Sequence, residues 1–461
     1  MFRKILIANR GVAAVRIAKT CRRLRVKIAS IYTIPDRASI HLDPKYSDER
    51  HEIDDYLSLE GIIKVARKSN VDAIHPGYGF RAEDFAFAKI CEENKIPFIG
   101  PGSKVMEKIG NKLYARKLMQ KTGLTIIPGA MSAAKDSEDA AAMAEELGYP
   151  VVLKPVYGGG GKGMHVAKDE KELRRDFETA QSEAATAFAR PEIYLEKYFE
   201  GIRHIEFQFL ADTHQHSIHL GERECSLQRR HQKLLEECPS PIVTDEMRSK
   251  VGRRVAEAVS EIGYVNAGTM EFLMDKKEKL YFMEINKRLQ VEHRPTEMVY
   301  GLDLVEQQLR IADGERLSLN QSEVKRLGAA MNLRIYAEDP SNDFQPSPGR
   351  VTRCVEPIAE EVIIDSALYS TYSVPVEYDP LVANVAVHGR NRSQTVNRAR
   401  AVMDHMWIDG IDTTATLHRE LLRDQAFLQG KLHTEFVPQF LRRIRLPIRA
   451  SLVDTMFDDA L

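Results

Sequence analysis

The chain has 461 residues, which at about 150 residues per domain is enough for roughly three domains with substantial cores. Its 43% hydrophobic and 29% charged residues are typical of a globular protein and exclude the disordered and fibrous classes. Lys and Arg number 66 against 67 Asp and Glu, so the net charge of −1 provides no overall field that would recruit nucleic acid or an anionic membrane. Any anion-binding site must therefore be local.

The sequence indicates neither a membrane anchor nor a disulfide framework. No apolar run approaches the roughly 20 residues of a membrane-spanning helix, and the N-terminus enters a strand-like segment without the apolar stretch of a signal peptide. We therefore expect a cytoplasmic protein, or an organellar one after processing. The five cysteines are odd in number and scattered, without a C-x-x-C pair, which argues against both disulfides and a zinc site.

The first hundred residues alternate short apolar runs with helical patterns. The pattern predicts strands over 4–8, 26–32 and 71–74, with helices over 11–24 and 58–69 between them. This order predicts a doubly wound parallel sheet with right-handed crossovers. Glycine and proline punctuate the chain at 100–102, and we place this α/β domain at 1–110.

The middle of the chain, 111–320, changes character. The pattern predicts helices over 104–122, 136–148 and 169–189, and strands over 150–154, 164–166, 193–197 and 204–209. The period-2 alternation of the later strands indicates an antiparallel sheet. From about 330 onward, Val-rich strands closed by a helix over 394–405 predict a third, β-rich domain at 330–440.

Four consecutive glycines begin at Gly158 and are followed by Lys162 and Gly163. A dinucleotide fold would require the glycines to open a helix, and a Walker loop would require Ser or Thr after the lysine. A strand-like run follows instead, so the glycines fit the tip of a hairpin whose backbone N–H groups close over phosphates. A plain surface loop is the alternative.

Alternate positions from 284 to 292 carry polar groups. In an extended conformation these five side chains share one face: Glu284, Asn286, Arg288, Gln290 and Glu292. A solvated edge strand is the alternative, although such a strand usually carries Lys, Ser and Thr. The mixture of acid, amide and guanidinium groups therefore indicates a site.

Two strands over 269–273 and 280–284, joined by the charged turn 275–279, predict a hairpin just before this segment. The hairpin can bring Glu271 near Glu284 and Asn286. Two carboxylates and an amide oxygen suit Mg²⁺ or Mn²⁺ bridging nucleotide phosphates. A satisfied ion-pair hairpin is the alternative.

Basic residues supply candidate anion contacts. Lys154 ends an apolar run, where a buried ammonium group must find an anion. Lys112 is a second candidate for a phosphate contact. The segment 222–233 packs four cationic side chains and a histidine, which suits bicarbonate, phosphate or carboxylate recognition. An exposed charged loop is the alternative for this segment.

Together these motifs resemble the biotin carboxylase component of biotin-dependent carboxylases, an ATP-grasp family, over nearly the whole chain. The matching motifs occur in the family's order at 7–11, 75–80, 98–101, 158–164, 222–237, 267–271, 284–293, 337–340 and 346–349. The resemblance implies an N-terminal doubly wound α/β domain. It also implies an ATP-grasp domain with a mobile lid at about 130–205 and a β-rich C-terminal domain.

In enzymes of this family, ATP phosphorylates bicarbonate to carboxyphosphate, which releases CO₂. Phosphate then takes the proton from the biotin ureido nitrogen, and this nitrogen attacks CO₂. The resemblance implies that ATP contacts Lys112, Lys154, Gly160, Gly161, Glu196, Lys197, His204, Gln228, His231 and Glu271. It assigns Mg²⁺ or Mn²⁺ to Glu271, Glu284 and Asn286, and bicarbonate to Lys233, Arg288, Gln290, Val291 and Glu292. Glu292 would be the base, and Arg334 would stabilise the biotin enolate.

The chain also departs from the family's pattern. Lys287 stands where threonine is usual and Arg294-Pro295 where Pro-Val is usual, while Asn111, Asn332 and Asn384 replace an expected Asp, Glu and Lys. Arg23 and Ile363 replace an acid and an arginine that are common at the family's dimer contact. A homodimer with altered contacts is therefore expected.

The resemblance implies partners as well. The chain contains neither a Met-Lys-Met biotinylation site nor a carboxyltransferase portion, so biotin is expected on a separate biotin carboxyl carrier protein, beside a separate carboxyltransferase of acyl-CoA or pyruvate type. Two other functions stay open: another ATP-grasp carboxylate–amine ligase and a catalytically impaired nucleotide-binding scaffold. The retained Lys233, Arg288, Glu292 and Arg334 argue against a scaffold.

Overall fold

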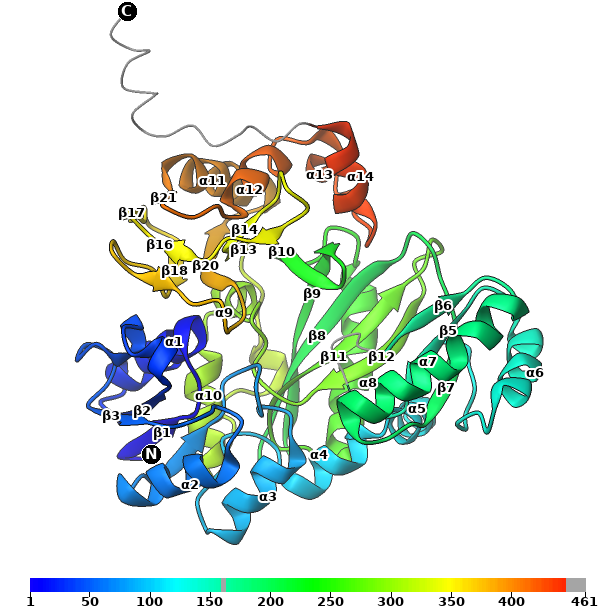
Figure 1. Cartoon of the computed structure of the whole chain (residues 1–461), viewed down its shortest axis with the longest axis horizontal. Helices are drawn as coiled ribbons and strands as arrows, with labels where there is room; N and C mark the ends of the chain where they lie inside the picture. Colours follow the sequence, from blue (N-terminus) through cyan, green and yellow to red (C-terminus); the bar gives the residue numbers. More distant parts are fainter. Residues whose placement is uncertain (159–162, 445–461) are drawn as a thin grey trace, which may run out of the picture.

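The computed structural model describes residues 1–158 and 163–444. Figure 1 shows an N-terminal part in blue, a projecting lid at the right and a C-terminal part at the top, arranged around a central sheet. No helix within the described ranges is both long and apolar enough to cross a membrane.

The N-terminal part is a four-stranded sheet in the order β3-β2-β1-β4, in which all neighbours are parallel. Its strands are β1 (Lys4–Ile7), β2 (Lys27–Tyr32), β3 (Glu49–Glu52) and β4 (Ala73–His75). Its helices are α1 (Gly11–Arg23), α2 (Leu59–Lys68) and α3 (Phe85–Glu93). Along β1, Ile5 and Ile7 pack with α1 residues, whereas Leu6 packs with α2 residues on the other face. Both faces are therefore covered, which confirms the predicted doubly wound sheet.

The single helix predicted over 104–122 is wrong, because the chain forms α4 (Ser103–Gly110) and α5 (Lys112–Lys121). Asn111 lies between them with extended backbone, and its side chain accepts a hydrogen bond from the Tyr114 N–H. This side chain caps α5, which explains the break. The cap also sets Lys112 at the first turn of α5.

The lid consists of α6 (Ser137–Leu147), α7 (Glu170–Phe188) and the antiparallel strands β5 (Val151–Pro155), β6 (His165–Ala167) and β7 (Ile193–Lys197). It encloses its own hydrophobic cluster, with Leu153, Leu173, Phe177 and Leu195 fully or nearly fully buried. Strands β5 and β6 pair as the hairpin that the glycine run predicts.

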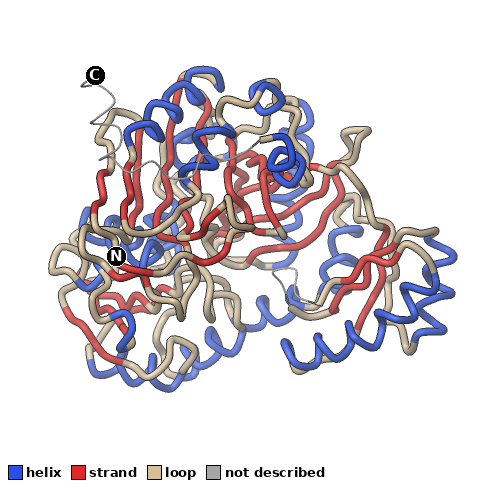
Figure 2. Tube along the Cα trace, turned by 45° about the horizontal axis from the view of Figure 1, so that its top comes forward, coloured by secondary structure: helices blue, strands red, loops and turns tan. Residues whose placement is uncertain are grey.

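The central sheet has eight strands in the order β12-β11-β8-β9-β10-β13-β20-β18, all antiparallel. The strands are β8 (Arg203–Ala211), β9 (Ser217–Arg229), β10 (Gln232–Cys238), β11 (Asn266–Met274), β12 (Leu280–Asn286), β13 (Ala329–Tyr336), β18 (Val362–Ser366) and β20 (Leu381–Gly389). Helices α8 (Asp245–Ile262), α9 (Arg294–Tyr300) and α10 (Leu304–Ala312) accompany it. Because β10 pairs with β13, one sheet continues across the expected boundary near 330, as the long run of strands in Figure 2 shows.

The C-terminal part packs helices on this end of the sheet. The helices are α11 (Arg392–His405), α12 (Ala415–Leu421), α13 (Gln425–Leu428) and α14 (Phe436–Arg443). Short antiparallel pairs join β14 (Glu338–Asp339) to β15 (Gln345–Pro346), β16 (Gly349–Arg350) to β19 (Ser373–Val374), and β17 (Arg353–Val355) to β21 (Trp407–Asp409). Buried residues of β13, β20 and α11 share one hydrophobic cluster, which fixes the strand that carries Arg334.

Candidate active site

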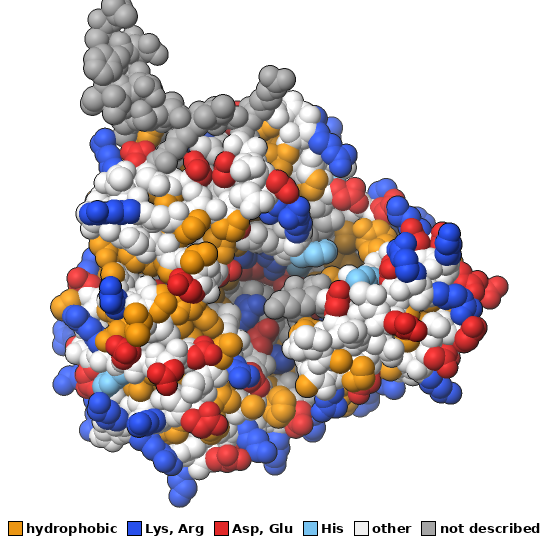
Figure 3. Space-filling model, viewed as in Figure 1, with side chains coloured by type: hydrophobic (Ala, Val, Ile, Leu, Met, Phe, Trp, Pro, Cys, Tyr) orange, Lys and Arg blue, Asp and Glu red, His pale blue; other side chains and the backbone are white. Residues whose placement is uncertain are grey.

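A cavity of about 450 Å³ opens between the lid, the N-terminal part and strand β12. Its lining includes Glu83, Lys112, Glu284, Asn286 and Lys287. Figure 3 shows a hollow beside the lid with acidic and basic side chains in its walls. The cavity therefore brings together one predicted phosphate contact and two predicted metal ligands.

Strands β11 and β12 form the predicted hairpin and set the carboxylates side by side. Its register pairs Glu271 with Glu284 and Thr269 with Asn286. Directly opposed residues on antiparallel strands share a face, so the two carboxylates are immediate neighbours. This confirms the hairpin and the predicted proximity.

The two carboxyl groups have opposite pKa shifts. Burial acts to raise the pKa of both, but the charge of Lys233 and the contact with His204 hold the pKa of Glu271 well below its usual value. At Glu284, burial and the Glu271 carboxylate together raise the pKa. Within the described residues the Glu284 carboxylate has no hydrogen bond or ion pair. A carboxylate at a cavity wall, repelled by its neighbour, fits a divalent cation, so this set suits Mg²⁺ or Mn²⁺.

Lys233 is the centre of a second, fully paired cluster. Its Nζ donates to Glu206 Oε2 at 2.7 Å, Glu271 Oε1 at 2.9 Å and Glu292 Oε1 at 2.6 Å. The second oxygen of Glu206 accepts from Arg223 Nε at 2.5 Å. Three acids surround one ammonium group, and this raises the pKa of Lys233 well above its usual value although burial opposes the rise. The lysine is therefore charged.

Glu292 lies between two cations. Besides Lys233, its Oε2 accepts from Arg334 Nη2 at 2.7 Å, and Arg334 Nε donates to Glu236 Oε1 at 2.5 Å. Glu292 is fully buried, and burial alone would raise its pKa. The charges of Lys233 and Arg334 instead hold the pKa of Glu292 well below its usual value. Glu292 is therefore an ionised carboxylate, able to accept a proton from a ligand that takes the place of these contacts.

The predicted continuous strand from 284 to 292 is wrong beyond Asn286, where β12 ends. The Lys287 N–H donates to Glu83 Oε1 at 2.8 Å, and Leu289 is buried in the core beneath the N-terminal sheet. Burial of Leu289 turns the chain out of the sheet. Glu292 reaches the Lys233 cluster from this irregular segment, 287–293, and not through strand alternation.

Arg288, Gln290 and Val291 belong to the same segment. Arg288 Nη1 donates to Gln290 Oε1 at 2.9 Å, and Arg288 Nε lies 3.7 Å from Glu83 Oε1. Val291 lies in the turn before Glu292. The guanidinium group is therefore held by its own segment and by Glu83 of the N-terminal part.

The lysine predicted to need an anion has one. Lys154 Nζ donates to Glu196 Oε2 at 2.6 Å, and the other oxygen of Glu196 contacts Arg116 and the Tyr194 hydroxyl. Lys112 Nζ donates to the carbonyls of Pro155 at 3.2 Å and Gly158 at 2.6 Å. Burial lowers the pKa of Lys112.

Lys197 points differently from Lys154. Its ammonium group donates to the carbonyls of Gly148 and Tyr149 at 2.7 and 2.9 Å, so the lid backbone holds it. The predicted phosphate contacts at Gly160 and Gly161 lie outside the described residues.

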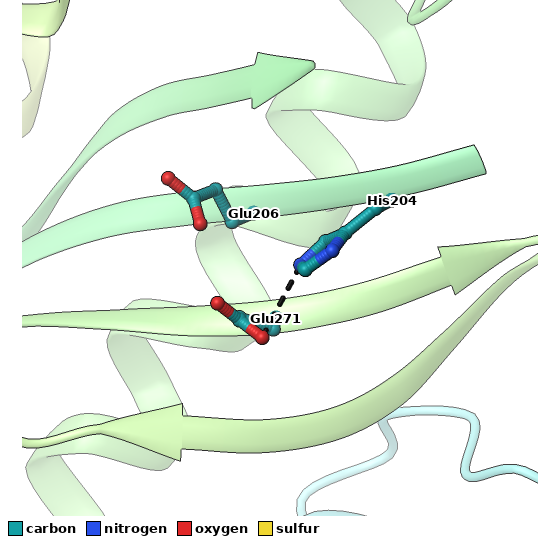
Figure 4. Close-up of side chains that lie close together, drawn as sticks. All are labelled: His204, Glu206 and Glu271. Carbon is teal, nitrogen blue, oxygen red and sulfur yellow. Dashed lines mark ion pairs between the residues drawn. The ribbon is translucent and has the colours of Figure 1, made fainter. Parts of the chain in front are cut away.

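His204 lies beside the carboxylates of Glu206 and Glu271. Figure 4 shows its ring directed at Glu271, and the Nε2–Oε2 distance is 3.2 Å. His204, Glu206 and Glu271 bring possible metal ligands within 4.8 Å of one another. Lys233 already donates to Glu206 and Glu271, whereas no such donor contacts Glu284 among the described residues, and this favours Glu284 as a metal ligand.

The predicted anion-binding segment 222–233 contributes two cations, Arg223 and Lys233, to the Lys233 cluster. The segment lies in β9 and β10, and Gln228 pairs with Lys233 in the ladder. His231 lies at the hairpin tip, where burial, with a smaller effect of the Lys154 charge, lowers its pKa. Arg229 and Arg230 instead pair with Asp343 on the surface.

Sequence reasoning did not identify Glu206, Glu236 and Arg116 as site residues, and it included Arg223 only as one cation of the charged segment 222–233. Each makes its ion pair across strands or between domains, so no local spacing indicates the partner. The alternation over 204–209 could have placed Glu206 on the same strand face as His204.

Three family models match the chain in succession. They are "Biotin carboxylase, N-terminal domain" over residues 1–106, "Carbamoyl-phosphate synthase L chain, ATP binding domain" over 111–320 and "Biotin carboxylase C-terminal domain" over 332–439.

Curated relatives match along nearly their full length. Biotin carboxylase 1 of Bacillus subtilis is 44% identical, over 95% of this chain and 99% of that protein. A pyruvate carboxylase subunit from Methanothermobacter thermautotrophicus is 43% identical, over 97% of this chain and 92% of that protein. The crystal structure of the biotin carboxylase domain dimer of Hydrogenobacter thermophilus 2-oxoglutarate carboxylase, with MgADP, ADP and bicarbonate, has a TM-score of 0.94 at 41% identity, over 98% of this chain and all of that one. The chain therefore belongs to the biotin carboxylase family of ATP-grasp ligases.

Proposed function

We propose that the chain carboxylates biotin at the expense of ATP and bicarbonate, in the first half-reaction of a multi-subunit carboxylase. Bicarbonate attacks the γ-phosphate of ATP, so that the bond from the γ-phosphorus to the β–γ bridging oxygen breaks and carboxyphosphate and ADP form. Carboxyphosphate then releases CO₂ and phosphate. Phosphate takes the ureido proton of biotin, and the ureido nitrogen bonds to CO₂.

The cavity side of the site binds the nucleotide in this proposal. Lys112 and Lys154 contact phosphates, with Glu196 holding Lys154 in place. The further ATP contacts carried over from the family are Gly160, Gly161, Lys197, His204, Gln228, His231 and Glu271. Glu271, Glu284 and Asn286 hold Mg²⁺ or Mn²⁺, which neutralises phosphate charge when it is bound. The unpaired Glu284 carboxylate supports this assignment.

The paired cluster binds the one-carbon substrate. Lys233 and Arg288, with Gln290 and Val291 beside them, hold bicarbonate, and Glu292 removes its proton. Arg334 stabilises the enolate of biotin. The observation that carries this proposal is the position of the ionised Glu292 carboxylate, 2.6 Å from Lys233 and 2.7 Å from Arg334. A base between an anion-binding lysine and an arginine on the neighbouring strand can serve both substrates.

The proposal includes partners. Biotin arrives on a separate carrier protein, and a separate carboxyltransferase takes the carboxyl group to its acceptor. A homodimer is part of the proposal, because the similar biotin carboxylase domain of 2-oxoglutarate carboxylase is a dimer in its crystal structure. Arg23 pairs within its own chain, with Asp303 at 2.9 Å and Glu306 at 2.7 Å, which supports altered contacts in that dimer.

The test is ADP release by the purified protein with MgATP, first without and then with bicarbonate, followed by addition of free biotin. Slow bicarbonate-dependent release that biotin accelerates is the expected result. ATP binding with no response to either addition would contradict the proposal and favour the scaffold. Acceleration by an amine in place of biotin would favour a carboxylate–amine ligase.

A further inference from the structure

Arg294 begins α9 two residues after Glu292 and makes a buried ion pair with the C-terminal part. Its Nε donates to Asp365 Oδ2 at 2.7 Å and its Nη2 to Asp365 Oδ1 at 3.0 Å. Arg294 and Asp365 are 8% and 1% exposed, so both charges lie out of bulk solvent. Each charge shifts the pKa of the other group further into its ionised range, raising that of Arg294 and lowering that of Asp365 against the effect of burial.

Asp365 and Arg334 lie in one row of the central sheet. Asn384 on β20 pairs with Arg334 on β13 and with Asp365 on β18, so the three residues lie side by side on one face. Two strand spacings place Asp365 and Arg334 about 10 Å apart. Arg334 holds Glu292, and Asp365 holds Arg294. Arg334 and Asp365, which lie in one row of the sheet, thus bind Glu292 and Arg294, which are two residues apart in the chain.

The segment between these points has no strand pairing to hold it. Residues 287–293 are irregular, and His293 lies between Glu292 and Arg294. His293 Nδ1 lies 2.7 Å from the Gln290 carbonyl, while its Nε2 accepts from Arg16 at 2.8 Å. Arg294 Nη1 also donates to Glu297 at 2.8 Å, which links the Arg294–Asp365 ion pair to the rest of α9.

We propose that the Arg294–Asp365 ion pair is a positioning device that fixes residues 287–293 on the sheet row of Arg334 and so sets the Glu292 carboxylate for proton removal. This inference rests on the proposed role of Glu292. Arg294 stands where the family resemblance leads one to expect proline. Arg294 is a positioning residue and does not itself contact substrate.

The test compares Arg294→Met, Arg294→Lys, Asp365→Asn and the Arg294→Met/Asp365→Asn pair with a matched control. Arg248 on α8 donates to both oxygens of Glu222 at 2.6 and 2.7 Å, in an equally buried bidentate pair away from 287–293. Arg248→Met therefore removes the same chemistry without touching the segment. For each variant, kcat and KM for bicarbonate-dependent ADP release and the unfolding temperature are measured.

We expect Arg294→Met to lower kcat about tenfold, because a small displacement of a reacting group has effects of this order or larger. The KM for MgATP should stay within about twofold, since the nucleotide contacts are made elsewhere. Arg294→Lys should recover part of kcat. The double variant should be no slower than the slower single one, because the two side chains contact each other, although Lys19 also donates to Asp365 at 2.9 Å. Arg248→Met should lower the unfolding temperature comparably and leave kcat within about twofold.

An unchanged kcat in Arg294→Met, with an unfolding temperature lowered as in Arg248→Met, would show a purely structural pair and overturn the inference. If the wild-type protein shows no bicarbonate-dependent turnover, the proposed function fails. The coupling between the Glu292 and Arg294 contacts is then tested by urea unfolding of Glu292→Gln, Arg294→Met and their combination. If the combined change in unfolding free energy is smaller than the sum of the single changes, the positioning role is supported. Additive changes overturn it.

Discussion

The two ends of the site differ in how their charges are balanced. At the bicarbonate end, Lys233, Glu292 and Arg334 already form a closed set of ion pairs. At the nucleotide end, Glu284 has no partner among the described residues, and Lys112 donates only to backbone carbonyls. The first end is organised before substrate binds. The second is only partly balanced, because Lys154 already pairs with Glu196 whereas Glu284 and Lys112 are left for a bound cation and nucleotide. The difference indicates preorganisation for the chemical step and dependence on ligands for nucleotide binding.

The hairpin β11–β12 is the boundary between these two ends. Glu271 belongs to the paired end and has a lowered pKa, while its ladder partner Glu284 belongs to the other and has a raised one. A single strand spacing thus separates a carboxylate that already pairs with Lys233 from one with no ion pair among the described residues.

The largest effect should come from removing the base at the paired end. Glu292→Gln keeps the size of the side chain and one acceptor but cannot take a proton, so bicarbonate-dependent ADP release should fall about 10²- to 10⁴-fold. Nucleotide affinity, measured by equilibrium binding of ATP, should stay close to that of the wild type. Glu261→Gln, at an exposed ion pair with Lys121, is the control. Turnover unchanged in Glu292→Gln would refute the assignment of the base.

At the nucleotide end, replacing one of the opposed carboxylates should have opposite effects on metal binding and stability. Glu284→Gln removes a like charge beside Glu271, so the metal-free protein should melt at a higher temperature. Its Mn²⁺ affinity, read by electron paramagnetic resonance, should fall about tenfold with loss of one charged ligand.

Glu107→Gln, which also lies at the cavity wall, is the matched control for the metal experiment and should change neither quantity. Equal Mn²⁺ affinity in Glu284→Gln and wild type would move the metal site away from the hairpin.

A smaller effect is expected from the lid lysine. Lys154→Met removes a charged phosphate contact but leaves Glu196 paired with Arg116, so the fold should survive. The KM for MgATP should rise about tenfold, as expected for one charge-assisted hydrogen bond. Lys121→Met, an exposed lysine on α5, should leave it unchanged. If both variants keep the wild-type KM, Lys154 serves the lid rather than the nucleotide.

The smallest effect should come from the buried histidine behind Arg334, and it concerns stability rather than turnover. His418 Nε2 lies 2.8 Å from the Arg334 carbonyl, and burial lowers the pKa of His418 from 6.5 to about 4. The unfolded chain therefore binds this proton first, so the wild-type protein loses stability as the pH falls from about 6.5 to about 4. His418→Gln should flatten that part of the curve of unfolding free energy against pH.

His405→Gln, at an exposed histidine, provides the comparison in the same urea titrations. Parallel curves for His418→Gln and wild type would show that the paired end is wetter than the structure indicates.

The sequence pattern predicted the features that depend on residues close together in the chain. The parallel sheet followed from apolar runs, and the proximity of Glu271 to Glu284 followed from two strands and a short charged turn. The register shift between Glu271 and Phe272, which sets the two carboxylates directly opposite each other, was not predicted. The path of 287–293 could not be predicted, because Leu289 leaves the strand to fill a core built from the distant N-terminal part. The same holds for Glu206 and Glu236, whose partners Lys233 and Arg334 lie on other strands.

Transfer of label from bicarbonate to free biotin tests the central claim most directly. Wild-type protein with MgATP and labelled bicarbonate should form carboxybiotin, with about one ADP released for each label transferred. Arg334→Met and Glu292→Gln should form none above background, while Arg248→Met should behave as wild type. ATP cleavage by the wild-type protein without label on biotin would contradict the account.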